Sequence, residues 1–263
     1  MDNGISTRPV SRRRIHGSGD RYRLAPETKL PGILEDVQDA YGWLRKTATE
    51  LHIDPTRLGI VGHSAGGYLA LMAGFALDPR PPVIVAFYGY GDVAGTWYSQ
   101  PDPYYLKQPL IPQAEAEATV GTTELSEAPA GNKRSTFYVY LRQQGLWPQR
   151  VTGLDPRRDG AAFDRFCPIR NVTLQYPPTL LLHGDADTDV PFQQSVDMIE
   201  GLTREKIPHD FIQLHGKGHV FDRDSTDPDV TAAFNRAVEF LNARLHPAQT
   251  GANMSVLPAK PVH

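Results

Sequence analysis

The chain has 263 residues, of which 40% are hydrophobic and 22% charged, with a formal net charge of -3. These values suit one large globular domain, and the weak net charge excludes strong non-specific attraction to nucleic acid. The sequence has no run of 18 apolar residues, so no transmembrane helix is expected. It has one cysteine, Cys167, which excludes an intrachain disulfide. Cys167 is expected to pack as a small buried apolar group.

Both ends of the chain are expected to be disordered tails, residues 1–20 and residues 246–263. The first contains four arginines and no apolar segment, so this chain has no recognisable signal peptide. Its localisation is therefore unknown, with the cytoplasm as the default. The second contains three prolines and no apolar periodicity.

Between the tails, residues 21–245 are expected to form one domain in which helices and strands alternate. Residues 32–50 are predicted to be an amphipathic helix, because apolar residues recur there at spacings of three and four. The later predicted elements are strand Leu58–Gly62, helix Ser64–Leu77, strand Val83–Phe87, strand Thr179–Leu182, helix Phe192–Glu205, strand Phe211–Leu214 and helix Pro228–Leu245. This alternation indicates an α/β fold with a mainly parallel sheet flanked by helices, and a site beyond the carboxyl ends of the strands.

Residues 92–170 differ from the rest of the domain in being rich in proline and aromatic residues. We interpret them as an insertion of short helices that covers the site as a cap. Its aromatic side chains either line an apolar pocket or, as base rates favour, pack the cap onto the core. They are Trp97, Tyr98, Tyr104, Tyr105, Phe137, Tyr138 and Tyr140.

The strongest local motif is Gly62-His63-Ser64-Ala65-Gly66-Gly67, between a predicted strand and a predicted helix. A serine hydroxyl needs a neighbouring base to become nucleophilic. A sharp turn between a strand and a helix exposes such a serine, and small neighbours allow the backbone to fold tightly there. The motif predicts Ser64 as a nucleophile and the Ala65 amide as an oxyanion donor at the helix N-terminus.

The base that takes the serine proton, and the acid that orients this base, are expected in loops after two later strands. Asp185, Asp187 and Asp189 follow the strand at 179–182, and spacing favours Asp187, then Asp189, then Asp185. The remaining aspartates are expected to cap the next helix or to be solvated.

His219 is the favoured base, because it lies in a glycine-rich loop beyond the last strand, with His215 as the alternative. The order Ser64, Asp187, His219 is the order of nucleophile, acid and base in α/β-hydrolases. The other histidines that we considered, His52, His63, His183 and His209, are interpreted as structural.

Several segments together resemble the hormone-sensitive-lipase-like esterases and related carboxylesterases, over residues 21–245. They are Tyr22-Arg23-Leu24-Ala25-Pro26-Glu27, Pro31, Glu35-Asp36, Trp43-Leu44, Asp54-Pro55-Thr56-Arg57-Leu58, the motif around Ser64, His183-Gly184, Asp187, Val190-Pro191 and Gly218-His219 with Phe221. The resemblance implies an α/β-hydrolase fold. His63 stands where the lipase-like branch has Asp, which favours neighbouring esterase and prolyl-oligopeptidase-like branches.

The resemblance fails at the N-terminus. The family has a His-Gly-Gly-Gly segment well upstream, after further strands, and its amides supply the other oxyanion donors. Only 20 residues precede Arg21, so we expect an N-terminally truncated fold, with His16-Gly17-Ser18-Gly19 as a chance match or a remnant of the family segment. An apolar strand edge would then be exposed, which predicts a homo-oligomer formed through that edge.

The resemblance implies a serine hydrolase that cleaves a small-molecule carboxylic ester through an acyl-enzyme on Ser64. Two alternatives stay open: a catalytically impaired or fragmentary hydrolase-fold protein, and a prolyl-oligopeptidase-like serine peptidase. No metal motif, P-loop or dinucleotide-binding glycine pattern occurs, so no cofactor or metal is expected.

Overall fold

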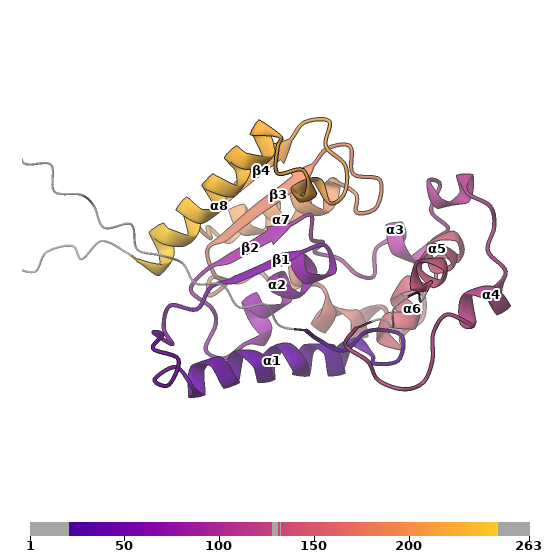
Figure 1. Ribbon diagram of the computed structural model, residues 1–263, viewed down its shortest axis with the longest axis horizontal. Coiled ribbons are helices and arrows are strands. Elements are labelled where there is room, and N and C mark those ends of the chain that lie inside the picture. Colours follow the sequence, from indigo (N-terminus) through magenta and orange to yellow (C-terminus); the bar gives the residue numbers. More distant parts are fainter. Residues whose placement is uncertain (1–20, 128–130, 132, 247–263) are drawn as a thin grey trace, which may run out of the picture.

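The structure is a computed structural model, and it describes residues 21–127, 131 and 133–246. The predicted tails lie outside this range except for His246, and so does the segment His16-Gly17-Ser18-Gly19. Within the described residues, the chain forms one sheet with helices packed on both faces (Figure 1).

Over the described residues the sheet has four strands, which neighbour one another in the order of the sequence. They are β1 (Ile60–His63), β2 (Ile84–Phe87), β3 (Thr179–Gly184) and β4 (His209–Leu214). All three neighbouring pairs are parallel, which confirms the predicted parallel sheet. The carboxyl ends of the strands therefore lie at one edge, where loops from distant parts of the chain meet.

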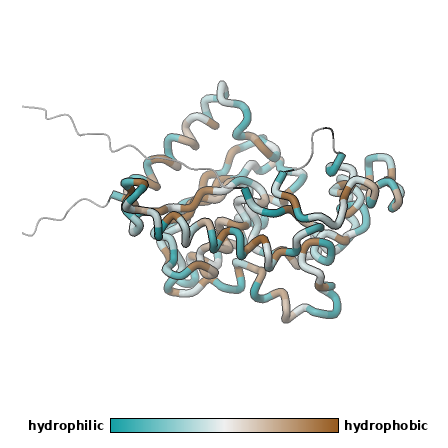
Figure 2. The backbone as a smooth tube through the Cα atoms, turned by 60° about the horizontal axis from the view of Figure 1, so that its bottom comes forward, coloured by the Kyte–Doolittle hydropathy of each residue, from teal (hydrophilic) through white to brown (hydrophobic). Residues whose placement is uncertain are grey.

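Alternate residues of β2 build two hydrophobic layers. Val85 and Phe87 belong to a cluster with buried residues of α8 (Pro228–Leu245). Ile84 and Ala86 belong to another, with residues of α2 (Ala65–Ala76) and α7 (Gln193–Arg204). The strand is thus buried on both faces, as expected of a central strand in a parallel sheet. Figure 2 shows the same concentration of hydrophobic residues along the central strands.

Several predicted boundaries differ from the observed ones, and three of these differences lie in the segment that leads to Ser64 and the helix after it. The first helix, α1, spans Leu30–Lys46 rather than 32–50, and begins earlier because Pro31 fits a first helical turn. The strand expected at 58–62 is shifted to Ile60–His63. Helix α2 begins at Ala65 rather than Ser64, because the backbone of Ser64 is not helical.

Residues 92–170 contain short helices, and those up to residue 152 lie together to one side of the sheet (Figure 1). They are α3 (Thr96–Ser99), η1 (Tyr105–Lys107), α4 (Gln113–Glu117), α5 (Arg134–Gln144), α6 (Trp147–Thr152) and η2 (Gly160–Phe166), with η3 (Pro168–Asn171) at the end. Phe137 and Tyr140 pack inside this segment, whereas Tyr98 packs against Tyr90 in a cluster shared with α1 and α2. Most of the aromatic residues named above for this segment are therefore packed against other side chains, although Tyr104 is exposed. Cys167 is fully buried in the shared cluster, as expected.

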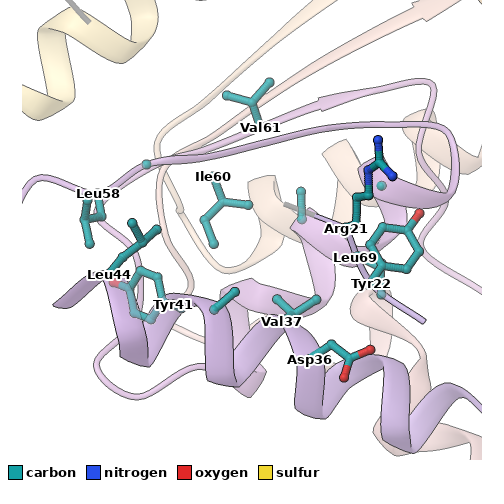
Figure 3. Close-up of a pocket in the computed structure, with 14 residues that line it drawn as sticks. Arg21, Tyr22, Asp36, Val37, Tyr41, Leu44, Leu58, Ile60, Val61 and Leu69 are labelled. Atoms are coloured by element: carbon teal, nitrogen blue, oxygen red, sulfur yellow. The ribbon is translucent and has the colours of Figure 1, made fainter. Parts of the chain in front are cut away.

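Among the described strands, β1 has a neighbour on one side only. A groove of about 230 Å³ lies beside it and is lined mostly by apolar residues of α1, β1 and α2, with Arg21 and Asp36 also at its wall. Figure 3 shows Ile60 pointing toward α1 and Val61 pointing to the opposite side of the strand, where it is 48% exposed. Within the described part of the chain, β1 is thus an open edge. No helix described by the structure is long and apolar enough to cross a membrane.

Candidate active site

Ser64 lies in a tight turn between β1 and α2. Its φ of 53° and ψ of -119° are unusual for a non-glycine residue, and its amide donates to the Phe87 carbonyl at 3.0 Å. Such a conformation costs on the order of 1–3 kcal/mol and persists only where the surroundings enforce it. A Cβ atom on Gly62 would lie 2.0 Å from the Gly66 carbonyl oxygen, so the turn closes only with glycine there.

His219 approaches Ser64 from the loop between β4 and α8. Its Nε2 lies 2.9 Å from the Ser64 Oγ, and its Nδ1 lies 2.7 Å from Asp187 Oδ2. Because the carboxylate can only accept, Nδ1 carries the hydrogen, which leaves Nε2 free to accept from the serine hydroxyl. The hydroxyl, imidazole and carboxylate therefore form one chain of hydrogen bonds.

The side chain of Asp187 is completely buried and fully hydrogen-bonded. Its Oδ1 accepts the amides of Asp189 and Val190 at 2.8 and 2.9 Å, while Oδ2 accepts from His219 and from His183. Burial alone would raise the pKa of this carboxyl, but the hydrogen bonds outweigh it and hold the pKa of Asp187 well below its usual value. Asp187 is therefore ionised and fixed in direction.

His183 contacts the carboxylate of Asp187, a contact that the sequence did not reveal. Its Nε2 donates to Asp187 Oδ2 at 3.2 Å and to the Val190 carbonyl at 3.1 Å, and its Nδ1 accepts from the Ser195 hydroxyl at 2.7 Å. The interpretation of His183 as structural agrees with its complete burial. Its position at the end of β3, four residues before Asp187, was the signal available in the sequence.

The other two aspartates have different surroundings. Asp185 accepts from the Gly216 amide and pairs with His215, whose side chain is 80% exposed. Asp189 instead contacts Tyr105, Tyr138 and Arg142 of the 92–170 segment. The expectation that the remaining aspartates cap the next helix or are solvated is wrong for Asp189, because the 92–170 segment folds over it.

A second group of polar side chains lies beside the turn at Ser64, and it was not predicted from the sequence. His63 Nδ1 is 3.0 Å from Asp222 Oδ2, and the Tyr88 hydroxyl donates to the same carboxylate. Burial and this hydrogen bond raise the pKa of Tyr88 well above its ordinary value, so its hydroxyl stays protonated. The Tyr88 ring meets the His219 ring edge-on at 4.6 Å between centroids, and thus packs the imidazole from one side. His63, interpreted as structural, belongs to this group.

Ala65 is the first residue of α2, at the helix end where backbone amides lack partners within the helix. Its side chain is exposed and its amide follows directly after Ser64. The position agrees with an oxyanion donor, a role that stays a prediction.

Comparison with known proteins identifies the family to which this chain belongs. Residues 20–202 match the family model BD-FAE, a range that includes Ser64 and Asp187 and ends before His219. A solved structure of an alpha/beta hydrolase superfamily protein from Enterococcus faecalis is 27% identical, with a TM-score of 0.67, and the match covers 85% of this chain and 77% of that one.

Two curated relatives match part of their own length only. Esterase LipC of Mycobacterium tuberculosis is 27% identical over 207 residues, covering 76% of this chain and 44% of LipC. The non-reducing polyketide synthase pkbA of Emericella nidulans is 26% identical over 256 residues, covering 76% of this chain and 10% of the synthase. The chain thus spans a tenth of the synthase and less than half of LipC.

Proposed function

Because the chain belongs to the BD-FAE family and has the α/β-hydrolase fold, we propose that it hydrolyses carboxylic esters through an acyl-enzyme on Ser64. The observation that carries the proposal is the chain of hydrogen bonds from Ser64 through His219 to Asp187, at 2.9 and 2.7 Å. The esterase named among its relatives, LipC, favours esters over peptides as the substrate class.

In the proposed reaction, the Ser64 Oγ attacks the ester carbonyl carbon while His219 Nε2 takes its proton. The Ala65 amide donates to the carbonyl oxygen as it becomes negative. The intermediate collapses when His219 returns the proton to the alcohol oxygen, which leaves with the bond to the acyl carbon broken. Water then attacks the acyl group with His219 again as base, and releases the carboxylic acid and Ser64.

Asp187 makes this proton transfer effective in two ways. Its hydrogen bond fixes the tautomer of His219 that has Nε2 free, and its charge stabilises the imidazolium that forms. The amides of Asp189 and Val190, together with His183, keep the carboxylate from turning away.

The test compares Ser64→Ala with Ser225→Ala, which changes an exposed serine farther along the loop between β4 and α8. A fluorophosphonate probe is expected to label the wild type and Ser225→Ala but not Ser64→Ala. Turnover of p-nitrophenyl acyl esters by Ser64→Ala is expected to fall by about 10⁶-fold, to background.

Equal labelling and turnover in the wild type and Ser64→Ala would contradict the proposal and favour a catalytically impaired hydrolase fold. A parallel panel of peptide amides distinguishes the third candidate, since a prolyl-oligopeptidase-like peptidase would cleave amides at rates comparable with esters.

A further inference from the structure

Asp189 lies on the reacting side of His219, opposite the position of Asp187. Its Oδ2 is 3.4 Å from His219 Nε2, the same nitrogen that lies 2.9 Å from the Ser64 Oγ. The imidazole therefore has a carboxylate at each ring nitrogen. Only the one at Nδ1 is needed to orient the ring, so the second requires its own explanation.

The segment 92–170 holds this second carboxylate in place. Asp189 Oδ1 accepts from the Tyr105 hydroxyl at 2.7 Å, from the Tyr138 hydroxyl and from Arg142 Nη1 at 3.0 Å. Arg142 Nη1 also donates to the Asp189 backbone carbonyl at 2.9 Å. With Oδ1 fully occupied, Oδ2 is the oxygen left to face His219.

Arg142 itself is anchored firmly. Its side chain is only 1% exposed, pairs with Asp102, and lies over the rings of Tyr98 and Tyr105 at 4.8 Å from each centroid. Burying a guanidinium is costly unless the charge is paired. Arg142 is paired with two carboxylates, those of Asp102 and Asp189, and the second pair holds Asp189 in its place in the loop after β3.

The polar groups around His219 come from three parts of the fold. The loop after β3 supplies Asp187 and Asp189, the turn between β1 and α2 supplies Ser64, and the residue after β2 is the neutral Tyr88. The groups that act through these neighbours are Asp222 and Arg223 beside Tyr88, His183 beside Asp187, and Tyr105, Tyr138 and Arg142, with Asp102, beside Asp189.

We infer that Asp189 is a second carboxylate of the proton-transfer machinery, which stabilises the proton on His219 Nε2 while Tyr105, Tyr138 and Arg142 set its position and moderate its charge. The inference rests on the proposed function of Ser64 and His219. While Nε2 is unprotonated, its lone pair gains nothing from a carboxylate at 3.4 Å. Once Nε2 has taken the serine proton, the same carboxylate attracts it, so the interaction favours the transition state over the resting state.

The first test replaces Asp189 with Asn, which keeps the shape and removes the charge. We expect Asp189→Asn to lower kcat about tenfold with KM little changed, because the protonated imidazole loses a stabilising neighbour. The acid limb of the pH–rate profile is expected to move to lower pH, since protonation of His219 becomes less favourable. Asp185→Asn is the matched control in the same loop, because Asp185 pairs with the exposed His215.

The second test increases the charge that His219 experiences. Tyr138→Phe removes one hydrogen bond from Asp189 Oδ1 and leaves more negative charge on the carboxylate. The acid limb is therefore expected to move to higher pH, opposite to Asp189→Asn. Tyr104→Phe is the control, because Tyr104 is 44% exposed and immediately precedes Tyr105.

A role of Asp189 in anchoring the 92–170 segment alone would lower activity in both variants and leave the acid limb unmoved. That result, or movement of both variants in the same direction, would overturn the inference. NMR titration of the His219 imidazole reads the same shift without turnover. A protein that is inactive toward esters but shows the opposite NMR shifts would thus refute the proposed function while leaving the electrostatic contact standing.

Discussion

At the residue scale, three aspartates at alternate positions of one loop have three different environments. Asp187 is buried with four hydrogen bonds, Asp189 contacts the 92–170 segment, and Asp185 is tied to a surface turn. The three residues are chemically identical in the sequence, and they differ in the protein because different groups pack around each one. From the environment of Asp187 we make two predictions about the variant Asp187→Asn, one for activity and one for stability.

The first concerns activity. Asp187→Asn replaces an acceptor at Oδ2 or Oδ1 with an amide that can donate, and so favours the tautomer of His219 that cannot accept from Ser64. We expect kcat for ester hydrolysis to fall by about 10⁴-fold. Steady-state kinetics beside Asp185→Asn measure the effect, and a loss below tenfold would argue against Asp187 as the acid.

The second concerns stability. The pKa of Asp187 is held below its unfolded value of about 3.9, so its ionised form stabilises the folded protein above that pH. This stabilisation is lost as the pH falls through the acid range toward the folded-state value. The difference in Tm between wild type and Asp187→Asn is therefore expected to be largest near pH 7 and to shrink below about pH 4, by differential scanning fluorimetry. A difference independent of pH would contradict it.

At the element scale, the junction of β1, α2 and β2 depends on backbones that approach closely. A Cβ on Gly62 would meet the Gly66 carbonyl, and one on Gly67 would lie 2.8 Å from the Phe87 carbonyl. Neither backbone atom can move away as a flexible side chain would. The strained conformation of Ser64 is thus maintained by packing between elements rather than by its own preference.

Gly62→Ala is accordingly expected to destabilise the protein by about 1–3 kcal/mol or more, because the added methyl overlaps backbone. Gly42→Ala is the matched control, since its Cβ would meet nothing within 4 Å and Gly42 lies inside α1. There the same change is expected to stabilise by about 0.5–1 kcal/mol. Urea unfolding measures both, and equal effects at the two sites would refute the argument.

At the scale of the whole molecule, the sheet is covered unevenly. α8 covers β2, β3 and β4 on one face, whereas Val61 of β1 is 48% exposed on that side and a groove lies beside the strand (Figure 3). Open apolar strand edges promote pairing with other chains. The homo-oligomer expected through this edge stays a prediction.

Val61→Lys tests it, because a charge on an edge strand opposes pairing. Sedimentation velocity is expected to show association that grows with protein concentration in the wild type and is weakened in Val61→Lys. Leu174→Lys, at an exposed apolar residue in the loop before β3, should leave association unchanged. A wild type that stays monomeric at every concentration would contradict the expectation.

Much of this fold was predictable because its signals are local. Apolar runs and periodicity located all four strands, and β4 differs only in beginning at His209 rather than Phe211. The glycines around Ser64 located the turn, because only small residues fit there. The order of Ser64, Asp187 and His219 likewise named three side chains that lie within hydrogen-bonding distance of one another in series.

The sequence by itself thus determined the layered α/β arrangement and the residues at its strand ends, since both follow from periodicity and from steric limits on the backbone. Only the tertiary structure decided that His183 supports Asp187, that Tyr88 packs against His219, and that Arg142 holds Asp189 beside Nε2. These contacts join residues that are distant in the chain or that face one another only after packing. No local pattern encodes them, because the partners of each charge are chosen by how separate elements come together.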